Sequence, residues 1–411
     1  MKILLLTQYF PPEVGAPQNR LYELAIRLQQ NSVQVDVLTA MPNYPAMQIH
    51  SSYKGKWFVK EQMNGLQLYR AWIFVSKSKA IPIRLLNYFS FVGSSLIRGL
   101  FIKGKYDYLM VESPPLFLGI TARILALNKG AKLIFNVSDL WPESAEKLGL
   151  VTNKQFLKWA TVLEEYLYRK AALITGQTQG IVQNIHSRFP MKKVYWLKNG
   201  VDMNFFDPEL LQKSNWRNEV GISSSAFVLL YAGILGHAQK LETILEAASK
   251  VTDLSEVKFV FVGSGPEKEF LLEEQQRLGL KNVQFFDVQP KQKMPEIVAA
   301  ANATIIPLRK LDLFKGAIPS KIFENLSMRK AILLGVDGEA RTLFIDEGKA
   351  GLYFEPENAD ALAEQIRVLY NDPLLQQELG NNGYNYVKRN FERDQLAAQF
   401  YTFLKENQHA Q

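Results

Sequence analysis

Short apolar runs rich in β-branched residues alternate, along the whole chain, with stretches whose apolar residues recur at the helical period. This alternation is typical of parallel sheets covered by helices on both faces. In the first half it predicts strands at Ile3–Leu6, Val33–Leu38, Tyr108–Val111, Leu133–Val137, Leu173–Thr175 and Val194–Leu197. In the second half it predicts strands at Phe227–Ala232, Lys258–Val262, Val283–Phe285, Thr304–Ile306 and Ala331–Leu334. The sequence therefore predicts an α/β protein of two doubly wound, Rossmann-like domains that face each other across a cleft.

The length of 411 residues exceeds what one hydrophobic core usually supports, which agrees with two domains. Asn199-Gly200 and Asp207-Pro208 interrupt the periodicity near the middle of the chain. We therefore expect an N-terminal domain over residues 1–198 and a C-terminal domain over residues 199–390. The last helical segment, about residues 391–411, is a candidate to pack back on the first domain.

Several kinds of chemistry are excluded by what the sequence lacks. With no cysteine there is no disulfide, thiolate metal site or cysteine nucleophile. The histidines are scattered, and neither a zinc-binding His-Glu-x-x-His nor a phosphate-binding Walker loop occurs. We therefore expect a metal-independent reaction without a cofactor.

The apolar start of the chain stops at Thr7-Gln8 and lacks a small-residue cleavage site, so it is interpreted as a strand rather than a signal peptide. A cytoplasmic location follows as an expectation. The net charge of +8 suits nucleic acid, anionic lipid or a phosphorylated substrate, and the total alone does not choose between them.

Two turns of the second domain carry lysines where parallel sheets usually bind ligands, beyond the carboxyl ends of strands. Gly236 and Lys240 lie in the turn Gly233–Lys240, and the periodicity places Lys240 in the first turn of a helix. The helix dipole disfavours a cation there by roughly 0.3–1 kcal/mol, which a bound anion would offset. The alternative is a solvated lysine that is tolerated at this small cost.

A second turn repeats this pattern, with Ser320 at a helix start and Lys321 in its first turn. Two such lysines favour one shared anionic ligand. Glu324, one turn into the same helix, is placed to accept hydrogen bonds from a ribose, and its alternative is an ordinary surface carboxylate.

The first domain offers weaker candidates at its strand ends. Gly15, in the proline-rich loop after the first strand, permits close approach of a ligand, or serves only the turn. Asp139 follows the strand that ends at Val137 and would face the acceptor, or it caps the next helix. Glu112 ends another strand, and the same alternative applies to it.

The segment 81–103 has apolar residues on one helical stripe and polar residues on another side, yet is too short between Arg84 and Arg98 to span a membrane. With Lys103 just beyond, it fits an interfacial helix on anionic lipid. The alternative is a core helix with a wide apolar face.

Five segments together resemble family 4 retaining glycosyltransferases of the GT-B fold, closest to bacterial amino-sugar transferases of the N-acetylfucosamine type. They are Tyr9–Gly15, Asp139–Glu143, Asn199–Asp202, Gly233–Lys240 and Pro319–Glu324. The resemblance implies that the Gly15 loop lies against the donor phosphates, Lys240 pairs with the diphosphate and Glu324 holds the ribose.

Three positions depart from the family pattern. Gly316 stands where many members have a glutamate that faces the sugar, and Ile234 stands where an arginine is common, a charge that Lys321 can replace. Many members have a histidine near the position of Asp139, which makes a catalytic role for Asp139 the weakest transfer.

The resemblance implies transfer of a sugar, such as an N-acetylated amino sugar, from a nucleoside diphosphate, with UDP the expected nucleotide. The acceptor would be lipid-linked or a saccharide in cell-surface polysaccharide synthesis. The configuration would be retained through front-face attack, and the protein would lie on the inner face of the plasma membrane without binding nucleic acid. The alternatives are a nucleotide-sugar epimerase and a two-lobed ligand-binding protein.

Overall fold

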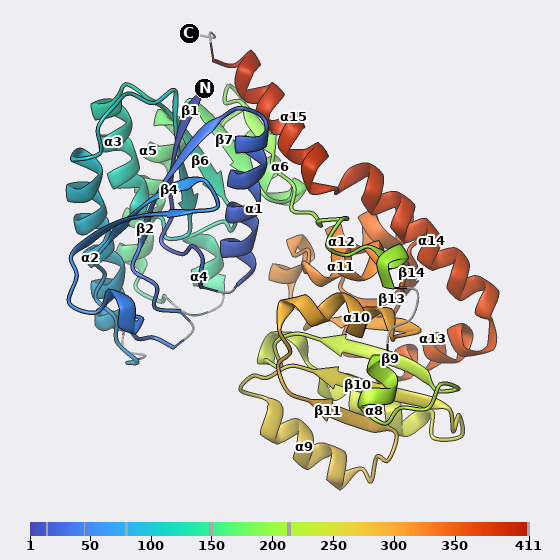
Figure 1. Ribbon diagram of the computed structural model, residues 1–411. Helices are drawn as coiled ribbons and strands as arrows, with labels where there is room; N and C mark the ends of the chain where they lie inside the picture. The colour runs from blue at the N-terminus through green and yellow to red at the C-terminus, as the bar shows by residue number, and fades with distance from the viewer. Residues whose placement is uncertain are drawn as a thin grey trace. The chain divides into compact units, whose positions relative to one another are not determined.

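The computed structural model describes residues 1–13, 15–44, 46–78, 81–147, 149, 151–211 and 215–408. The chain forms two compact units (Figure 1), the first made of Met1–Asn199 with Arg393–Gln411 and the second of Gly200–Glu392. Each unit is a mainly parallel sheet with helices on both faces, so the predicted class of two Rossmann-like α/β domains is confirmed.

The sheet of the first unit has the strand order β3-β4-β2-β1-β5-β6-β7-β8. All neighbours are parallel except β3 and β4. The strands are β1 (Lys2–Leu6), β2 (Gln34–Ala40), β3 (Phe58–Met63), β4 (Leu66–Ala71), β5 (Tyr108–Ser113), β6 (Lys132–Val137), β7 (Leu173–Gly176) and β8 (Val194–Trp196). The sequence prediction missed the hairpin of β3 and β4.

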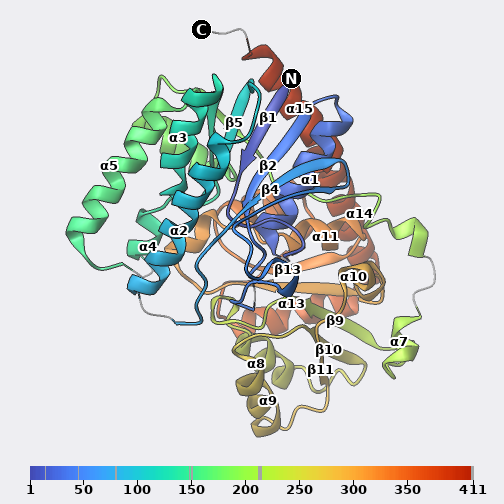
Figure 2. The ribbon, with the colours of Figure 1, turned by 60° about the vertical axis from the view of Figure 1, so that its left-hand side comes forward.

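Alternate side chains of the central strands pack against different helices, as expected for a sheet covered on both faces. Leu4 and Leu6 of β1 belong to a core with α2, α3 and α5, whereas Ile3 and Leu5 belong to a core with α1 and α15. The helices are α1 (Ala16–Gln30), α2 (Ile81–Leu100), α3 (Leu118–Lys129), α4 (Glu143–Lys147), α5 (Lys154–Lys170), α6 (Gln179–Arg188) and α15 (Arg393–Glu406). The view in Figure 2 brings α2, α3 and α5 to one side of this sheet.

Helix α15, the last of the chain, is part of the first unit. Phe400 and Leu404 are fully buried among residues of α1 and the sheet, and Tyr195 of β8 stacks on Phe403 with 4.4 Å between ring centroids. Arg27 of α1 also pairs with Asp394 at 2.5 Å. The C-terminal segment therefore completes the core of the unit that begins the chain.

Helix α2 turns part of its polar side toward the interior of the unit. Asn87, Ser94 and Ser95 are all buried. Asn87 and Ser94 donate hydrogen bonds to the carbonyls of Phe74 and Trp72 in the segment after β4. The polar side chains thus satisfy backbone groups inside the unit, and apolar side chains of α2 are left outside.

The sheet of the second unit is wholly parallel, with the order β11-β10-β9-β12-β13-β14. Its strands are β9 (Phe227–Ala232), β10 (Val257–Val262), β11 (Val283–Phe286), β12 (Ala303–Pro307), β13 (Ala331–Gly335) and β14 (Gly351–Tyr353). Its helices are α7 (Trp216–Glu219), α8 (Glu242–Lys250), α9 (Lys268–Arg277), α10 (Met294–Ala299), α11 (Lys321–Ser327), α12 (Glu339–Arg341), α13 (Ala359–Asn371) and α14 (Pro373–Asn390). The edge strand β14 was not predicted.

Candidate functional site

In the second unit, both lysine-bearing turns lie at the carboxyl edge of the sheet, on neighbouring strands. The turn after β9 begins at Gly233, and the connection after β12 leads into α11, whose first residue is Lys321. The backbone N–H of Arg309, just after β12, donates to the carbonyl of Ala238 in the β9 turn at 2.9 Å. The strand order therefore joins the two predicted turns into one site.

Glycines allow two loops at this edge to approach at backbone contact. Gly233 has φ 141°, and Gly263, in the loop after β10, has φ 151°. A Cβ on Gly263 would lie 1.9 Å from the carbonyl oxygen of Gly233, so no other residue fits there without a shift of the backbone. The loop that contains Gly263 and Gly265 thus packs directly against the candidate ligand loop.

Lys321 lies over this loop rather than in open solvent. Its ammonium is 3.8 Å from the centroid of the Tyr231 ring and would be 2.9 Å from a Cβ on Gly233. Desolvation by the surrounding protein lowers the pKa of Lys321 to about 7, while Glu324 nearby acts in the opposite direction. A bound anion would add a second counter-charge to that of Glu324.

Lys240 is placed differently from the prediction. It precedes α8, which begins at Glu242, and ends a 3-10 turn over His237–Gln239 that follows Gly236. Its backbone is left-handed, with φ 48°, and its ammonium pairs with Glu242 at 2.9 Å. The expectation of a cation inside the first helical turn was wrong, because the chain makes the extra 3-10 turn before the helix starts.

The remaining predicted residues of this edge lie at the start of α11. Ser320 precedes the helix without a side-chain capping bond, and Glu324 lies in the first turn with Lys321. Gly316 ends a short 3-10 segment, and a Cβ there would meet nothing within 4 Å. A side chain at position 316 would therefore meet no obstacle at its Cβ.

Arg309 is a cation of this edge that the sequence reasoning missed. It is half-buried, and its Nε is buried without a hydrogen-bond partner among the described residues. A buried guanidinium nitrogen without a partner is uncommon and favours an absent ligand. Its position directly after a predicted strand was the available signal.

In the first unit, Asp139 follows β6 and is held by a neighbouring side chain. The hydroxyl of Ser144, in α4, donates to Asp139 Oδ2 at 2.7 Å. The helix α4 begins only at Glu143, and no described backbone N–H bonds to the Asp139 carboxylate. The arrangement differs from the helix cap that was the alternative for this residue.

A buried polar network lies beside Asp139. Arg20 of α1 bonds to Glu112, at the end of β5, at 2.5 Å and to the hydroxyl of Ser138 at 2.6 Å. It also bonds to Gln177, after β7. The network links α1 to the carboxyl ends of three strands, and Arg20 was not predicted because its position inside a helix gave no signal.

The Gly15 loop is fixed from within the first unit. Glu13 is buried and accepts backbone N–H groups from Asn43 at 2.7 Å and Tyr44 at 2.8 Å, while burial raises the pKa of Glu13. Gly15 itself is extended, with φ 176°, so its backbone does not require glycine. A Cβ there would meet only the end of the Gln18 side chain, which can move aside.

Two of the predicted membrane residues are described. Lys103 is exposed after α2, whereas Arg98 is half-buried, with its guanidinium 5.2 Å from the ring centroid of Tyr69 and 5.7 Å from that of Phe58. The predicted lipid-facing role of Arg98 is therefore corrected, because it stacks on the β3–β4 hairpin. The side chain of Arg84 lies outside the described part of the structure.

The described residues contain no group of three or more histidine and carboxylate side chains placed to hold a metal ion. In the same part of the chain, no helix has the length and apolar character needed to cross a bilayer.

Two family models match consecutive parts of the chain. The model described as a glycosyl transferase 4-like domain matches residues 15–200, and the model described as glycosyl transferases group 1 matches residues 212–386. These matches follow the two units of the structure. They give no support to the epimerase alternative.

A relative similar over nearly full length is WcaI of Escherichia coli (strain K12), whose name places it among glycosyl transferases of colanic acid biosynthesis. It is 24% identical over 97% of this chain and 98% of its own. The alpha-D-kanosaminyltransferase of Streptomyces kanamyceticus is 24% identical over 55% of this chain and 57% of its own.

Solved structures share the architecture at low identity. Sucrose-phosphate synthase from Thermosynechococcus elongatus superimposes with a TM-score of 0.74 and 15% identity, over 98% of each chain. Anabaena HepE, in complex with UDP and glucose, gives a TM-score of 0.71 and 17% identity, over 98% of this chain and 99% of that chain.

Proposed function

This chain is a glycosyltransferase of the GT-B fold, with a 4-like domain and a group 1 domain, and we propose that it transfers a sugar from UDP to an acceptor in cell-surface polysaccharide synthesis. The name of WcaI supports the polysaccharide context, and the UDP bound to HepE supports UDP as the nucleotide. We propose an N-acetylated amino sugar as the sugar that is transferred, because of the family resemblance described above.

The observation that carries the donor proposal is the desolvated ammonium of Lys321 against the Gly233 turn. A diphosphate beside it would gain a charge-assisted interaction and would offset the cost of desolvating this ammonium. Lys240 and Arg309, at the same edge, would add positive charge where the diphosphate leaves. Gly236 would let the backbone approach the phosphates, and Glu324 would accept hydrogen bonds from the ribose hydroxyls.

For the reaction itself we propose transfer with retention of configuration and without a metal ion. The leaving diphosphate would take the proton of the attacking acceptor hydroxyl, while the lysines stabilise the charge that develops on it. Asp139, held by Ser144, would orient the acceptor.

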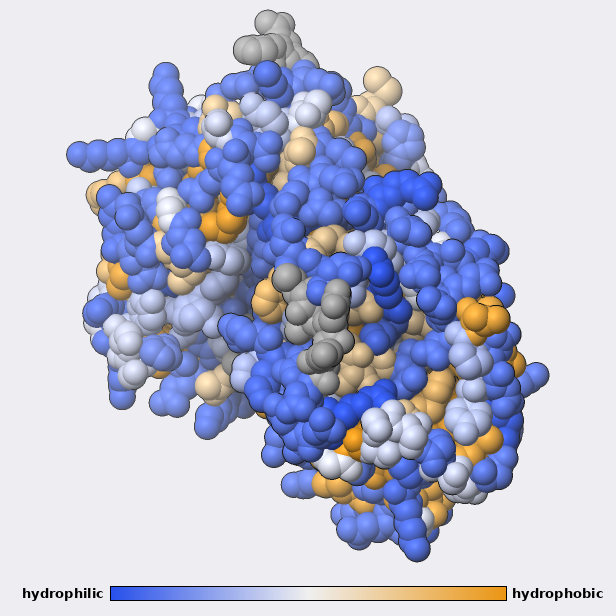
Figure 3. Space-filling model, turned by 45° about the vertical axis from the view of Figure 1, so that its right-hand side comes forward, coloured by the Kyte–Doolittle hydropathy of each residue, from blue (hydrophilic) through white to orange (hydrophobic). Residues whose placement is uncertain are grey.

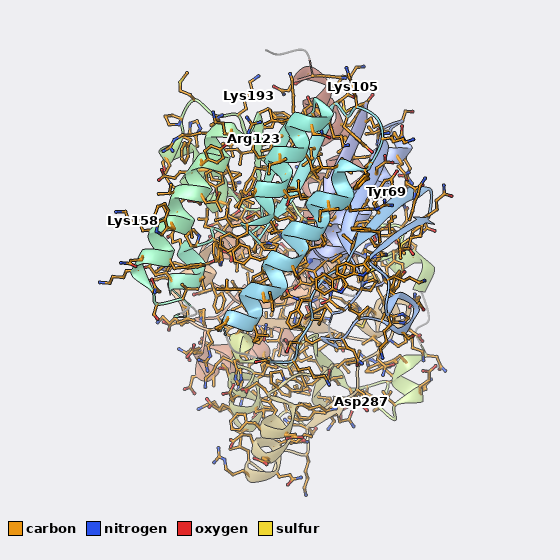
Figure 4. The ribbon with its side chains drawn as sticks, turned by 90° about the vertical axis from the view of Figure 1, so that its left-hand side faces the viewer. Tyr69, Lys105, Arg123, Lys158, Lys193 and Asp287 are labelled. Atoms are coloured by element: carbon orange, nitrogen blue, oxygen red, sulfur yellow. The ribbon has the colours of Figure 1, made fainter. Side chains whose placement is uncertain are left out.

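Exposed apolar side chains on one face of the first unit support peripheral attachment to a membrane. They come from α2 and the turn after it, α3 and α5: Leu86, Phe89, Ile97, Leu100, Phe101, Ile120, Ile124, Leu127, Trp159, Val162 and Tyr166. Basic residues such as Lys158 of α5 project from this face (Figure 4). The face drawn in Figure 3, by contrast, is mainly hydrophilic with small separate apolar groups. We propose that the apolar face rests on anionic lipid at the inner side of the plasma membrane, near a lipid-linked acceptor.

The proposed donor is tested by thermal shifts of the purified protein with a panel of nucleotide sugars, because a ligand of the folded state raises the apparent melting temperature. UDP-sugars should raise it, and Lys321→Ala should abolish most of that rise. Lys330→Ala is the matched control, since the pKa of Lys330 is also lowered by burial, to about 8, but Lys330 precedes β13 at the opposite edge. The donor site would be contradicted if none of the nucleotide sugars raised the melting temperature. It would also be contradicted if Lys321→Ala and Lys330→Ala reduced the rise equally.

A further inference from the structure

An apolar pocket of about 310 Å³ lies in the first unit, within the range of roughly 300–1,000 Å³ that is usual for small-molecule sites. Its walls come from α2, the turns after β5 and β6, α4 and the start of α5. The lining residues are Leu85, Tyr88, Pro114, Pro115, Leu116, Phe117, Trp141, Ala145, Val151, Thr152, Asn153 and Phe156. We refer to it as the α2–α5 pocket.

The lining suits a hydrocarbon better than a polar group. None of the described lining residues is charged, and aromatic rings form much of the wall, with Phe117 5.5 Å from Trp141 and 6.0 Å from Phe156 between ring centroids. The Oδ1 of Asn153 already accepts the backbone N–H of Phe156 at 3.0 Å. A peptide or sugar placed here would leave its own hydrogen-bonding groups without partners, whereas an alkyl chain has none to satisfy.

Two residues of the pocket wall are close in sequence to the candidate acceptor residue, Asp139. Trp141 follows Asp139 by two positions, and Ala145 follows Ser144, the residue that holds the Asp139 carboxylate. The segment that carries Asp139 and Ser144 therefore also contributes to the pocket wall.

The pocket wall also contacts a residue of the apolar face described above. Phe89, 44% exposed on α2, lies 4.7 Å from Phe117 between ring centroids, so the wall of the pocket runs into the surface proposed to meet lipid.

We propose that the α2–α5 pocket binds the first part of the hydrocarbon chain of a lipid-linked acceptor and so presents the attached head group to Asp139. This inference rests on the proposed transfer reaction and narrows its acceptor to the lipid-linked class. Each buried methylene should strengthen binding about fourfold until the pocket is full.

The test measures binding of hexadecyl phosphate and of butyl phosphate to the whole protein by equilibrium dialysis, below the micelle concentration and without nucleotide. We expect hexadecyl phosphate to bind at least about 100-fold more tightly, since several methylenes are buried. Thr152→Asp, at an exposed position of the pocket wall, should weaken the binding of hexadecyl phosphate at least about tenfold. Equal binding of the two phosphates would overturn the proposal.

The matched control is Leu127→Asp, which adds the same charge to an exposed apolar residue of α3 outside the pocket. Its effect on hexadecyl phosphate should be under about twofold. If Leu127→Asp lost as much affinity for hexadecyl phosphate as Thr152→Asp, binding would be assigned to the outer apolar face. That result would overturn the proposal for the pocket. UDP affinity, measured on the same proteins, should be unchanged in both variants. Failure of the unsubstituted protein to bind UDP would instead contradict the proposed function. The alkyl phosphate measurement, made without nucleotide, would still test the pocket.

Discussion

The ammonium of Lys321 lies 3.8 Å from the centre of the Tyr231 ring, which brings the first residue of α11 onto the end of β9. Two predicted turns that are far apart in sequence meet through this contact. It places a desolvated cation where the resemblance puts the phosphates of a donor.

The affinity for UDP should fall as the pH rises from about 7 to about 9, because Lys321, with a pKa near 7, loses its proton over this range. The phosphates are already ionised there and do not change. Losing one charge-assisted interaction should cost roughly tenfold in affinity. Titration calorimetry at several pH values measures it, and Lys321→Arg, which stays charged, should remove most of the dependence.

The stability of the ligand-free protein should show the opposite trend. Between pH 7 and the ordinary lysine pKa near 10.4, the unfolded chain binds a proton at Lys321 that the folded chain does not. This residue's contribution to stability therefore increases with pH over that window and is lost as the pH falls through it. In Lys321→Met the denaturant midpoint should depend less on pH, and an unchanged slope would show that Lys321 is not desolvated.

Glu324→Gln should weaken recognition of the ribose while the protein still folds. A neutral amide is a weaker acceptor than a carboxylate, so the preference for UDP over 2′-deoxy-UDP should fall by about tenfold. Competition binding with the two nucleotides gives this ratio directly. If the variant distinguishes them as well as the unsubstituted protein does, Glu324 does not contact the 2′ hydroxyl.

Asp139→Asn should reduce turnover by about 100-fold with little change in donor affinity, if the carboxylate orients the acceptor. Ser144→Ala should have a smaller effect in the same direction, because it removes the hydrogen bond that holds Asp139. Turnover is compared with UDP binding on the same preparations. A helix cap would tolerate asparagine, so full activity in Asp139→Asn would return this residue to a structural role.

Gly263→Ala should lower the free energy of unfolding by about 3 kcal/mol, because its Cβ would lie 1.9 Å from the Gly233 carbonyl oxygen. UDP affinity should fall with it, since the Gly233 turn would move. Gly316→Ala is the control, because a Cβ there meets nothing within 4 Å. Urea unfolding of both variants measures the difference, and equal stabilities would contradict the close packing of the two loops.

Attachment to vesicles should depend on the exposed cations of the first unit and not on Arg98. The protein should pellet with anionic vesicles at low salt and be released at high salt. Each lysine near such a surface contributes about 1 kcal/mol, so Lys103→Glu with Lys158→Glu should weaken binding at least tenfold. Arg98→Gln should have little effect, because Arg98 stacks on Tyr69. Equal pelleting with neutral vesicles would contradict the electrostatic part of the proposal.

The sequence predicted the parallel core well because buried strands are continuous apolar runs, as in β1, β6 and β9. The β3–β4 hairpin was missed because β3 is an edge strand with alternating exposure and polar residues at its centre. Its turn, Asn64-Gly65, has φ 48° and φ 84°, the conformation that Asn-Gly favours, so the signal was present.

The positions of single side chains were harder to predict than the elements that carry them. Periodicity gave α2 correctly as a helix, but it could not reveal that Asn87 and Ser94 meet backbone carbonyls after β4. Lys240 was misplaced because the 3-10 turn before α8 leaves no apolar pattern. Lys321 was placed correctly, because proline and serine mark the start of α11.

The return of the chain to its first unit sets an order on biosynthesis. The N–H of Val201 donates to the carbonyl of Phe391 at 2.9 Å. The segment that enters the second unit therefore lies beside the segment that leaves it. Residues 200–392 leave the ribosome as a complete unit, whereas the first unit lacks Phe400 and Leu404 of its core until the second unit has been made. During synthesis of the second unit, the nascent first unit therefore exposes the surface of α1 that α15 later covers. The second unit is free to fold during this time.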